Sequence, residues 1–137
     1  MDKLINGTAA DGPIRFMAAI TTEIAAEAMR RHQTSPTVSA ALGRVMTGTL
    51  LLGASLKEYD RLTVKIECDG AVKGIIAEAS MDDKVRGYVK NPHAELPPND
   101  NGKFNVSGII GKGMFYVIRE SGFDIGLHRE PYSVQFR

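Results

Sequence analysis

The sequence predicts an α+β fold in which an antiparallel sheet of hairpins packs against two main helices, and we expect dimerisation to complete it. Over residues 36–56 apolar side chains recur at spacings of three, four and seven, as on one face of a helix. From residue 61 the apolar residues alternate with polar ones, as in a strand with one buried face. The 137 residues, of which 43% are hydrophobic, suffice for one compact domain.

The first part of the chain predicts a short strand and a helix. Residues 14–20 form a mainly apolar run that is compatible with a strand. Thr21 or Thr22 is suited to cap a helix over residues 23–33, because a threonine hydroxyl accepts a hydrogen bond from a free N–H of the first helical turn. One face of this helix is apolar at its beginning and charged at its end, so we expect it to pack on one side only.

A second and longer helix is predicted over residues 36–56. Residues 35–36 read Ser-Pro, a cap followed by a proline at the first helical position, where the missing N–H costs nothing. Glycine inside a helix costs ~1 kcal/mol relative to alanine. Gly43, Gly48 and Gly53 therefore indicate close approach of another element, and we expect this helix to be central and tightly packed.

The strands that follow predict an antiparallel meander. Asp69-Gly70 is a hairpin turn signal, and strands are expected over residues 61–69, 71–80 and 84–90. The middle strand is apolar on both faces, so both faces of the sheet must be covered. Two alternatives remain open: the helices cover one face and later elements or a dimer partner cover the other, or the second face is a binding platform.

The last part of the chain predicts a loop and a second hairpin. Residues 91–103 are too polar and too rich in proline for a central strand, and they divide the chain without marking a second domain. Residues 114–120 and 124–130 are strand-like runs joined by Ser121-Gly122, a candidate turn. A new segment is expected to begin at Pro131.

Charge and composition exclude several classes of partner. The 17 basic and 16 acidic residues give a net charge of +1, which favours neither nucleic acid nor an anionic membrane. The apolar stretch over residues 45–56 is shorter than the ~20 residues of a membrane span, and the N-terminus shows no export signal. We therefore expect a cytoplasmic location. Cys68 is the only cysteine, so we expect no internal disulfide and no metal or cofactor in this chain.

No residue pattern requires an enzyme, and no catalytic residue is assigned. The three histidines are not adjacent to a motif that would place a nucleophile beside them, and Cys68 continues an apolar strand face, where we expect a buried and inert thiol. One alternative function is a small nucleotide-binding domain or enzyme that uses the Gly111-Lys112-Gly113 turn. Its spacing is shorter than in a phosphate-binding loop, and a strand follows where that loop needs a helix.

Several short motifs resemble, in their order and spacing, those of one known family. In the helical half they are Thr21-Thr22-Glu23, His32 with Ser35-Pro36, and Ala41-Leu42-Gly43-Arg44. In the sheet they are Asp69-Gly70, Val85-Arg86-Gly87-Tyr88-Val89, Asn91-Pro92, Gly111-Lys112-Gly113 and Glu130-Pro131-Tyr132. From about residue 14 to residue 133 the chain resembles the N-terminal part of the redox-regulated heat-shock holdase, the thirty-three-kilodalton heat-shock protein.

The resemblance implies an ATP-independent cytoplasmic chaperone that holds unfolded or partly folded client proteins under oxidative or heat stress. In that family an apolar sheet surface is covered by a linker and a C-terminal domain, whose four cysteines hold zinc until oxidation releases it. The active form is a homodimer with exchanged elements. We therefore expect residues 1–137 to be a single truncated N-terminal substrate-binding domain without the zinc-binding redox switch, and zinc only in the C-terminal domain of longer family members.

The expected client-binding surface lies on the sheet. Its residues are Val64, Ile66, Val72, Ile75, Ile76, Val85, Tyr88, Phe115 and Val117. Cys68 matches none of the family's zinc ligands, so no metal ligand is assigned in this chain.

Overall fold

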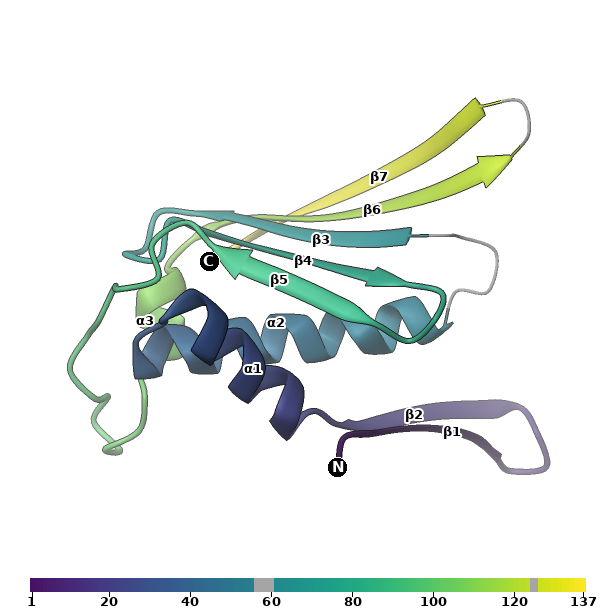
Figure 1. Ribbon diagram of the computed structural model, residues 1–137, viewed down its shortest axis with the longest axis horizontal. Coiled ribbons are helices and arrows are strands. Elements are labelled where there is room, and N and C mark those ends of the chain that lie inside the picture. Colours follow the sequence, from purple (N-terminus) through teal and green to yellow (C-terminus); the bar gives the residue numbers. More distant parts are fainter. Residues whose placement is uncertain (56–60, 124–125) are drawn as a thin grey trace.

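Helices cover one face of a five-stranded antiparallel sheet in the computed structural model, which describes residues 1–55, 61–123 and 126–137 (Figure 1). The elements are β1 (Lys3–Ala9), β2 (Ile14–Ile20), α1 (Thr22–His32), α2 (Pro36–Ser55), β3 (Arg61–Cys68), β4 (Gly74–Ser80), β5 (Val85–Val89), α3 (Val106–Ile110), β6 (Gly113–Phe123) and β7 (Gly126–Phe136). The order in the large sheet is β5-β4-β3-β6-β7, and β1 and β2 form a separate hairpin. The α+β architecture and the antiparallel meander are confirmed.

The core lies between α2 and the part of the sheet formed by β3, β4 and β5. Leu42 and Met46 of α2 are buried there with Val64 of β3 and Ile75 of β4. Because side chains alternate along a strand, the same strands turn polar residues to the opposite face, which we call the open face. Helix α2 does not extend over β7, and Figure 1 shows the β6–β7 hairpin reaching beyond the helical layer.

Two of the three helical glycines mark close contacts of α2. A methyl group at Gly43 would lie 3.2 Å from Cβ of Ala25 in α1, and one at Gly53 would lie 2.8 Å from Cβ of Ala79 in β4. At Gly48 it would meet nothing within 4 Å. The expectation of close packing is confirmed at the first two positions only.

Helix α2 also has the length and composition of a membrane span. The mean hydropathy of its most apolar window is 1.2, and 44% of that window is buried inside the fold. The helix packs against the sheet, α1 and α3. This packing is that of a core helix in a globular domain.

The loop that follows β5 is fastened to the beginning of α2. The N–H of Ser35 donates to the carbonyl oxygen of Pro92 at 2.9 Å, and the hydroxyl of Thr37 donates to the carboxylate of Glu95 at 2.5 Å. The loop predicted over residues 91–103 is confirmed in this region. It positions α3, which the sequence pattern did not predict because five residues are too few to show a helical period.

Three local predictions were wrong. Strand β1 was missed because its residues show no alternation of apolar and polar side chains. Ser121 and Gly122 form no turn but lie within β6, opposite residues 128 and 127 of β7. Pro131 likewise begins no new segment, since β7 continues through it to Phe136. Residues 56, 124 and 125 lie outside the described part of the chain.

Candidate functional site

The predicted site residues do not form one surface. Val64, Ile66, Val72 and Ile75 are only 2%, 7%, 0% and 0% exposed, because α2 and α3 cover the sheet where these side chains point. Val72 is not on a strand at all but in the turn before β4. Because these four residues are buried, they are not accessible to a ligand. They belong to the core.

Two predicted residues lie together on the open face. Ile76 of β4 is directly opposite Tyr88 of β5, and Tyr88 is 49% exposed. Val85 is half-buried on the helix side of the same sheet. Since Val85 and Tyr88 point to opposite faces of β5, a single ligand cannot cover both of them without wrapping around the strand.

Charged pairs interrupt the open face. Glu78 accepts hydrogen bonds from Arg86, the shorter at 2.7 Å, and lies 3.5 Å from Arg61. Lys65 pairs with Glu67 at 2.5 Å, which raises the pKa of Lys65 and lowers that of Glu67, and the Lys65 ammonium lies 5.7 Å from the ring centre of Tyr116. The open face is thus amphipathic rather than continuously apolar.

The remaining two predicted residues belong to a more apolar surface on the helix side of β6 and β7. Its members are Phe115, Val117, Tyr132, Val134 and Phe136, which we call the uncovered hairpin face. Phe115 is opposite Val134, and Val117 is opposite Tyr132, so the two strands present these side chains to the same side. Tyr132 is 55% and Val134 is 64% exposed, because α2 lies over β3, β4 and β5 instead.

The sequence pattern missed Tyr132, Val134 and Phe136 because the hairpin turn was placed too early. With the turn at residues 121–122, these residues fall outside any predicted strand. The alternation of Tyr132, Val134 and Phe136 with Pro131, Ser133 and Gln135 is the signal that identifies β7.

A hollow of about 550 Å³ adjoins the uncovered hairpin face. Ile66, Phe115, Val134 and Phe136 line it from the sheet, and Ile110 lines it from α3. Its walls are mainly apolar, with Arg137 as the one charged side chain among the residues that line it, so it is suited to hydrocarbon side chains. Arg119 bounds the apolar surface on the other side: its guanidinium lies 4.8 Å from the ring centre of Tyr132 and donates to the hydroxyl of Tyr132 at 2.7 Å.

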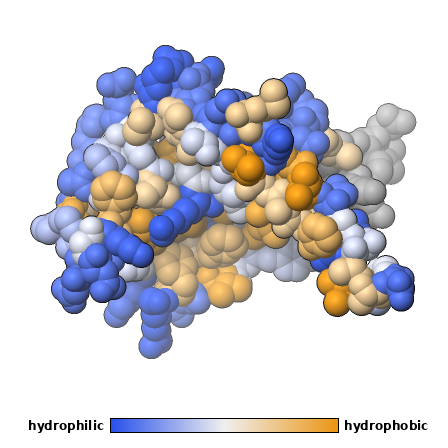
Figure 2. Space-filling model, turned by 90° about the horizontal axis from the view of Figure 1, so that it is seen from below, coloured by the Kyte–Doolittle hydropathy of each residue, from blue (hydrophilic) through white to orange (hydrophobic). Residues whose placement is uncertain are grey.

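The β1–β2 hairpin carries a second exposed apolar face. Ile5, Ile14, Phe16 and Ile20 are each about half exposed, and the ring of Phe16 lies over Gly7. Figure 2, which views the molecule from the side of the helices and this hairpin, shows apolar residues exposed among hydrophilic ones. A two-stranded ribbon is marginal in stability by itself, which makes this face a candidate contact surface.

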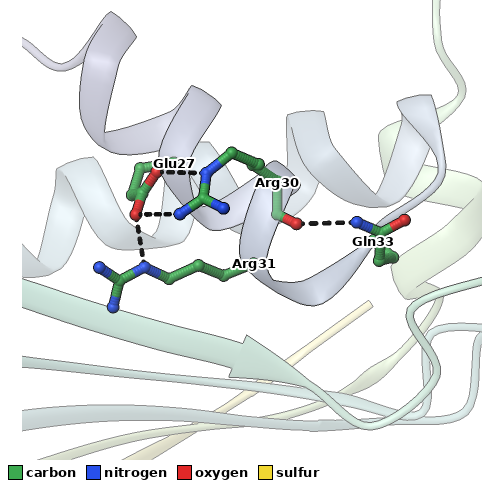
Figure 3. Close-up of polar contacts among 4 residues, drawn as sticks. All are labelled: Glu27, Arg30, Arg31 and Gln33. Carbon is green, nitrogen blue, oxygen red and sulfur yellow. Dashed lines mark hydrogen bonds and ion pairs between the residues drawn. The ribbon is translucent and has the colours of Figure 1, made fainter.

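A second hollow, of about 520 Å³, lies between α1, α2 and β5 and contains charges of both signs. Glu27 in its wall accepts hydrogen bonds from Arg30 at 2.8 Å and from Arg31 at 2.5 Å (Figure 3). These two guanidinium groups, Arg30 first, lower the pKa of Glu27 to about 2. The charges are paired within the fold, so this hollow favours neither an anionic nor a cationic ligand.

The structure gives no support to a phosphate site at the Gly111-Lys112-Gly113 turn. The backbone N–H of Lys112 donates to the carboxylate of Asp69 at 2.7 Å, so it is not free to bind an anion. The segment that follows is β6, whereas a phosphate-binding loop continues into a helix.

Neither a metal centre nor a reactive thiol is indicated. Among the side chains that the structure describes, which exclude those of residues 56–60 and 122–130, no three of His, Cys, Asp or Glu are grouped as metal ligands. Cys68 is half-buried, and burial raises the pKa of its thiol. A raised pKa lowers the fraction of reactive thiolate at neutral pH.

Comparison with known proteins decides the family. The model of the family described as Hsp33 protein matches residues 2–135. The chain belongs to the Hsp33 family. The resemblance seen in the sequence motifs is therefore confirmed.

Relatives and a solved structure agree with this assignment. A "33 kDa chaperonin" of Trichormus variabilis is 48% identical over 133 residues, which are 96% of this chain and 42% of that protein. A "33 kDa chaperonin" of Clostridium botulinum is 46% identical over 133 residues, which are 43% of that protein. The crystal structure of the 33 kDa chaperonin from Thermotoga maritima aligns with a TM-score of 0.85 at 36% identity, over 97% of this chain and 44% of that one. The chain thus spans less than half the length of these Hsp33 relatives.

Proposed function

We propose that this chain binds unfolded or partly folded polypeptides without ATP and without catalysing a reaction, and that it does so through the uncovered hairpin face. The observation that carries the proposal is the exposure of Tyr132 and Val134 beside the half-buried Phe115 and Val117. Clustered exposed side chains of this size mark interaction sites in globular proteins. Membership of a family whose relatives are named chaperonins supports the same function.

The proposed substrate follows from the chemistry of this face. Unfolded chains expose apolar side chains that folded proteins bury, and their burial against Tyr132 and Val134 removes apolar area from water. Binding of this kind needs no nucleotide, since the free energy comes from desolvation. The proposed role is that of a holdase in the cytoplasm during heat or oxidative stress.

We also propose that the redox switch lies outside these residues. The single thiol, Cys68, is half-buried and belongs to the strand that packs on α2. Holding by this chain is therefore constitutive, and zinc is assigned to the additional length of the longer relatives.

We further propose that the chain forms a homodimer. The exposed apolar face of β1–β2, with Ile5 and Phe16, is suited to burial against a second copy. Sedimentation equilibrium at two protein concentrations measures this association, and a constant monomer mass up to 100 μM excludes it.

Light scattering of a chemically denatured client tests the holding function. We expect an equimolar amount of the folded chain to reduce aggregation in the absence of ATP and oxidant. Unchanged scattering, with the chain shown to be folded by circular dichroism, rules the function out.

A further inference from the structure

Two asparagines of the chain, Asn6 and Asn101, directly precede a glycine. In such a pair the backbone nitrogen of the glycine can attack Cγ of the asparagine side chain, because glycine has no Cβ to shield that nitrogen or to restrict the backbone. A C–N bond forms, and the side-chain nitrogen leaves as ammonia with the proton that the backbone nitrogen gives up. Water then opens the resulting succinimide ring at either carbonyl, which leaves aspartate or isoaspartate. The reaction consumes one water and needs no other reactant.

Asn101 lies in the loop between β5 and α3, in a turn that Asn99 holds together. The side-chain oxygen of Asn99 accepts hydrogen bonds from the N–H groups of Asn101 and Lys103, both at 3.0 Å. The side chain of Asn101 is exposed and makes no hydrogen bond within the part of the chain that the structure describes. Its amide is therefore accessible to attack and contributes nothing to the turn.

Gly102 has the conformational freedom that ring closure requires. Its φ is +70°, and a Cβ built on it would meet nothing within 4 Å, so the backbone has room to rotate there. The N–H of Gly102 donates to the carbonyl oxygen of Asn99 at 2.8 Å, a single bond that closes an exposed turn. Turns of this kind open without unfolding the domain, and each opening frees the nitrogen for attack on Asn101.

Asn6 has the same following residue but different surroundings. Asn6 and Gly7 lie in the middle of β1 and are paired with Met17 and Phe16 of β2. A Cβ at Gly7 would lie 2.5 Å from Cζ of Phe16, so the aromatic ring covers this glycine. Ring closure requires rotation of the backbone between asparagine and glycine, which the pairing of the two strands opposes.

The other three asparagines are held by hydrogen bonds of their side chains. The amide of Asn91 donates to the carbonyl oxygen of Ala71 at 2.9 Å, and the side-chain oxygen of Asn105 accepts from the N–H of Gly108 at 3.0 Å. Neither of these residues precedes a glycine, and nor does Asn99. Asn101 thus differs from all other asparagines of the chain in combining a following glycine, a free side chain and a turn.

We propose that Asn101 is a site of spontaneous covalent modification, at which the folded chain converts asparagine to aspartate and isoaspartate, while the pairing of β1 with β2 protects Asn6. This inference is independent of the proposed holding function. The product adds a negative charge next to Asp100, and isoaspartate also inserts a methylene group into the backbone. The inserted group alters the spacing between Asn99 and the N–H groups that it accepts, so the turn before α3 changes.

Peptide mapping by mass spectrometry, on the 137-residue chain incubated at pH 8, tests the inference. Fragmentation locates the conversion of amide to acid at each asparagine. We expect Asn101 to convert at least tenfold faster than Asn6 in the folded chain. In guanidinium chloride we expect the two rates to agree within threefold, because both residues precede a glycine and the fold no longer separates them.

Two results of this measurement overturn the inference. One is equal conversion of Asn101 and Asn6 in the folded chain, which shows that the strand pairing does not protect Asn6. The other is a tenfold difference that persists in guanidinium chloride, which assigns the difference to the neighbouring sequence and not to the fold.

Release of ammonia by the folded chain gives a second measurement with matched variants. Asn101→Gln keeps an exposed amide, but glutamine has to close a six-membered ring, which forms far more slowly, so we expect ammonia release to fall at least fivefold. Asn6→Gln is the control, and we expect it to leave ammonia release unchanged. A fall with Asn6→Gln but not with Asn101→Gln overturns the inference.

Discussion

The carboxylate of Asp2 accepts a hydrogen bond from the backbone N–H of Ile24 at 2.7 Å, and a second from that of Glu23 at 2.9 Å. A residue that precedes β1 thus supplies the cap of α1 across 22 positions of sequence. Thr21, one of two predicted caps, makes no capping bond and instead shares a hydrogen bond with the hydroxyl of Thr47 at 2.6 Å. The cap couples the chain's first residues to the helical layer.

Removal of this cap is expected to destabilise the domain. Asp2→Ala leaves the N–H groups of Glu23 and Ile24 without their acceptor, and loss of an N-cap costs about 1 kcal/mol. Urea unfolding followed by circular dichroism measures the change. Asp100→Ala is the control, since Asp100 makes no side-chain hydrogen bond or ion pair in the described part of the chain. If Asp100→Ala lowers the free energy of unfolding as much as Asp2→Ala does, Asp2 is not the cap of α1.

The two glycines of α2 that differ in surroundings predict opposite effects. Gly48→Ala meets no atom within 4 Å, so the better helix propensity of alanine stabilises the domain by about 1 kcal/mol. Gly53→Ala places a methyl 2.8 Å from Cβ of the buried Ala79, and the resulting overpacking outweighs the gain, by about 1 kcal/mol net. Thermal unfolding of both variants checks the prediction, and a Tm that rises with Gly53→Ala refutes the close contact.

How far the sequence predicts this molecule depends on which contacts decide each feature. The helix over residues 36–56 and the strand over residues 61–69 follow from local periodicity, and both are present with small differences at their ends. Strand β1 forms through pairing with β2, which no local pattern records. The position of the apolar surface was predictable only in part, because alternation shows that Phe115 and Val117 share a face of their strand but not how far α2 extends across that face.

Glu27 provides a prediction for the dependence of stability on pH. Its pKa of about 2, set by Arg30 and then Arg31, lies below the usual value of 4.5. A carboxyl with a lowered pKa in the folded state contributes its stabilisation above pH 4.5 and loses it as the pH falls toward 2. We expect Glu27→Gln to be less stable than the original chain at pH 7, with a difference that narrows below pH 4.5. Urea titrations at pH 7, 4 and 3 measure this difference in the free energy of unfolding. A difference that stays constant with pH contradicts the stabilising contact of Glu27 with Arg30 and Arg31.

Cys68 provides a prediction for redox behaviour. Because burial raises the pKa of its thiol, we expect its reaction with a thiol reagent at pH 8 to be slower than that of free cysteine. Cys68→Ser is expected to leave aggregation suppression unchanged, with or without hydrogen peroxide. If hydrogen peroxide changes aggregation suppression by the original chain but not by Cys68→Ser, the thiol of Cys68 acts as a redox switch.

Neighbouring positions on β7 allow the uncovered hairpin face to be separated from the open face. Val134 points to the helix side and is 64% exposed, whereas Gln135 points to the other side of the same strand. Val134→Ser removes apolar contact area at an exposed site with little cost to the fold, so we expect the amount of chain needed for half-maximal suppression of client aggregation to rise several-fold. Gln135→Ser alters only the open face, and we expect it to act as the original chain. If Tyr88→Ser weakens holding while Val134→Ser does not, the binding surface is the open face, because Tyr88 and Val134 lie on opposite faces of the sheet.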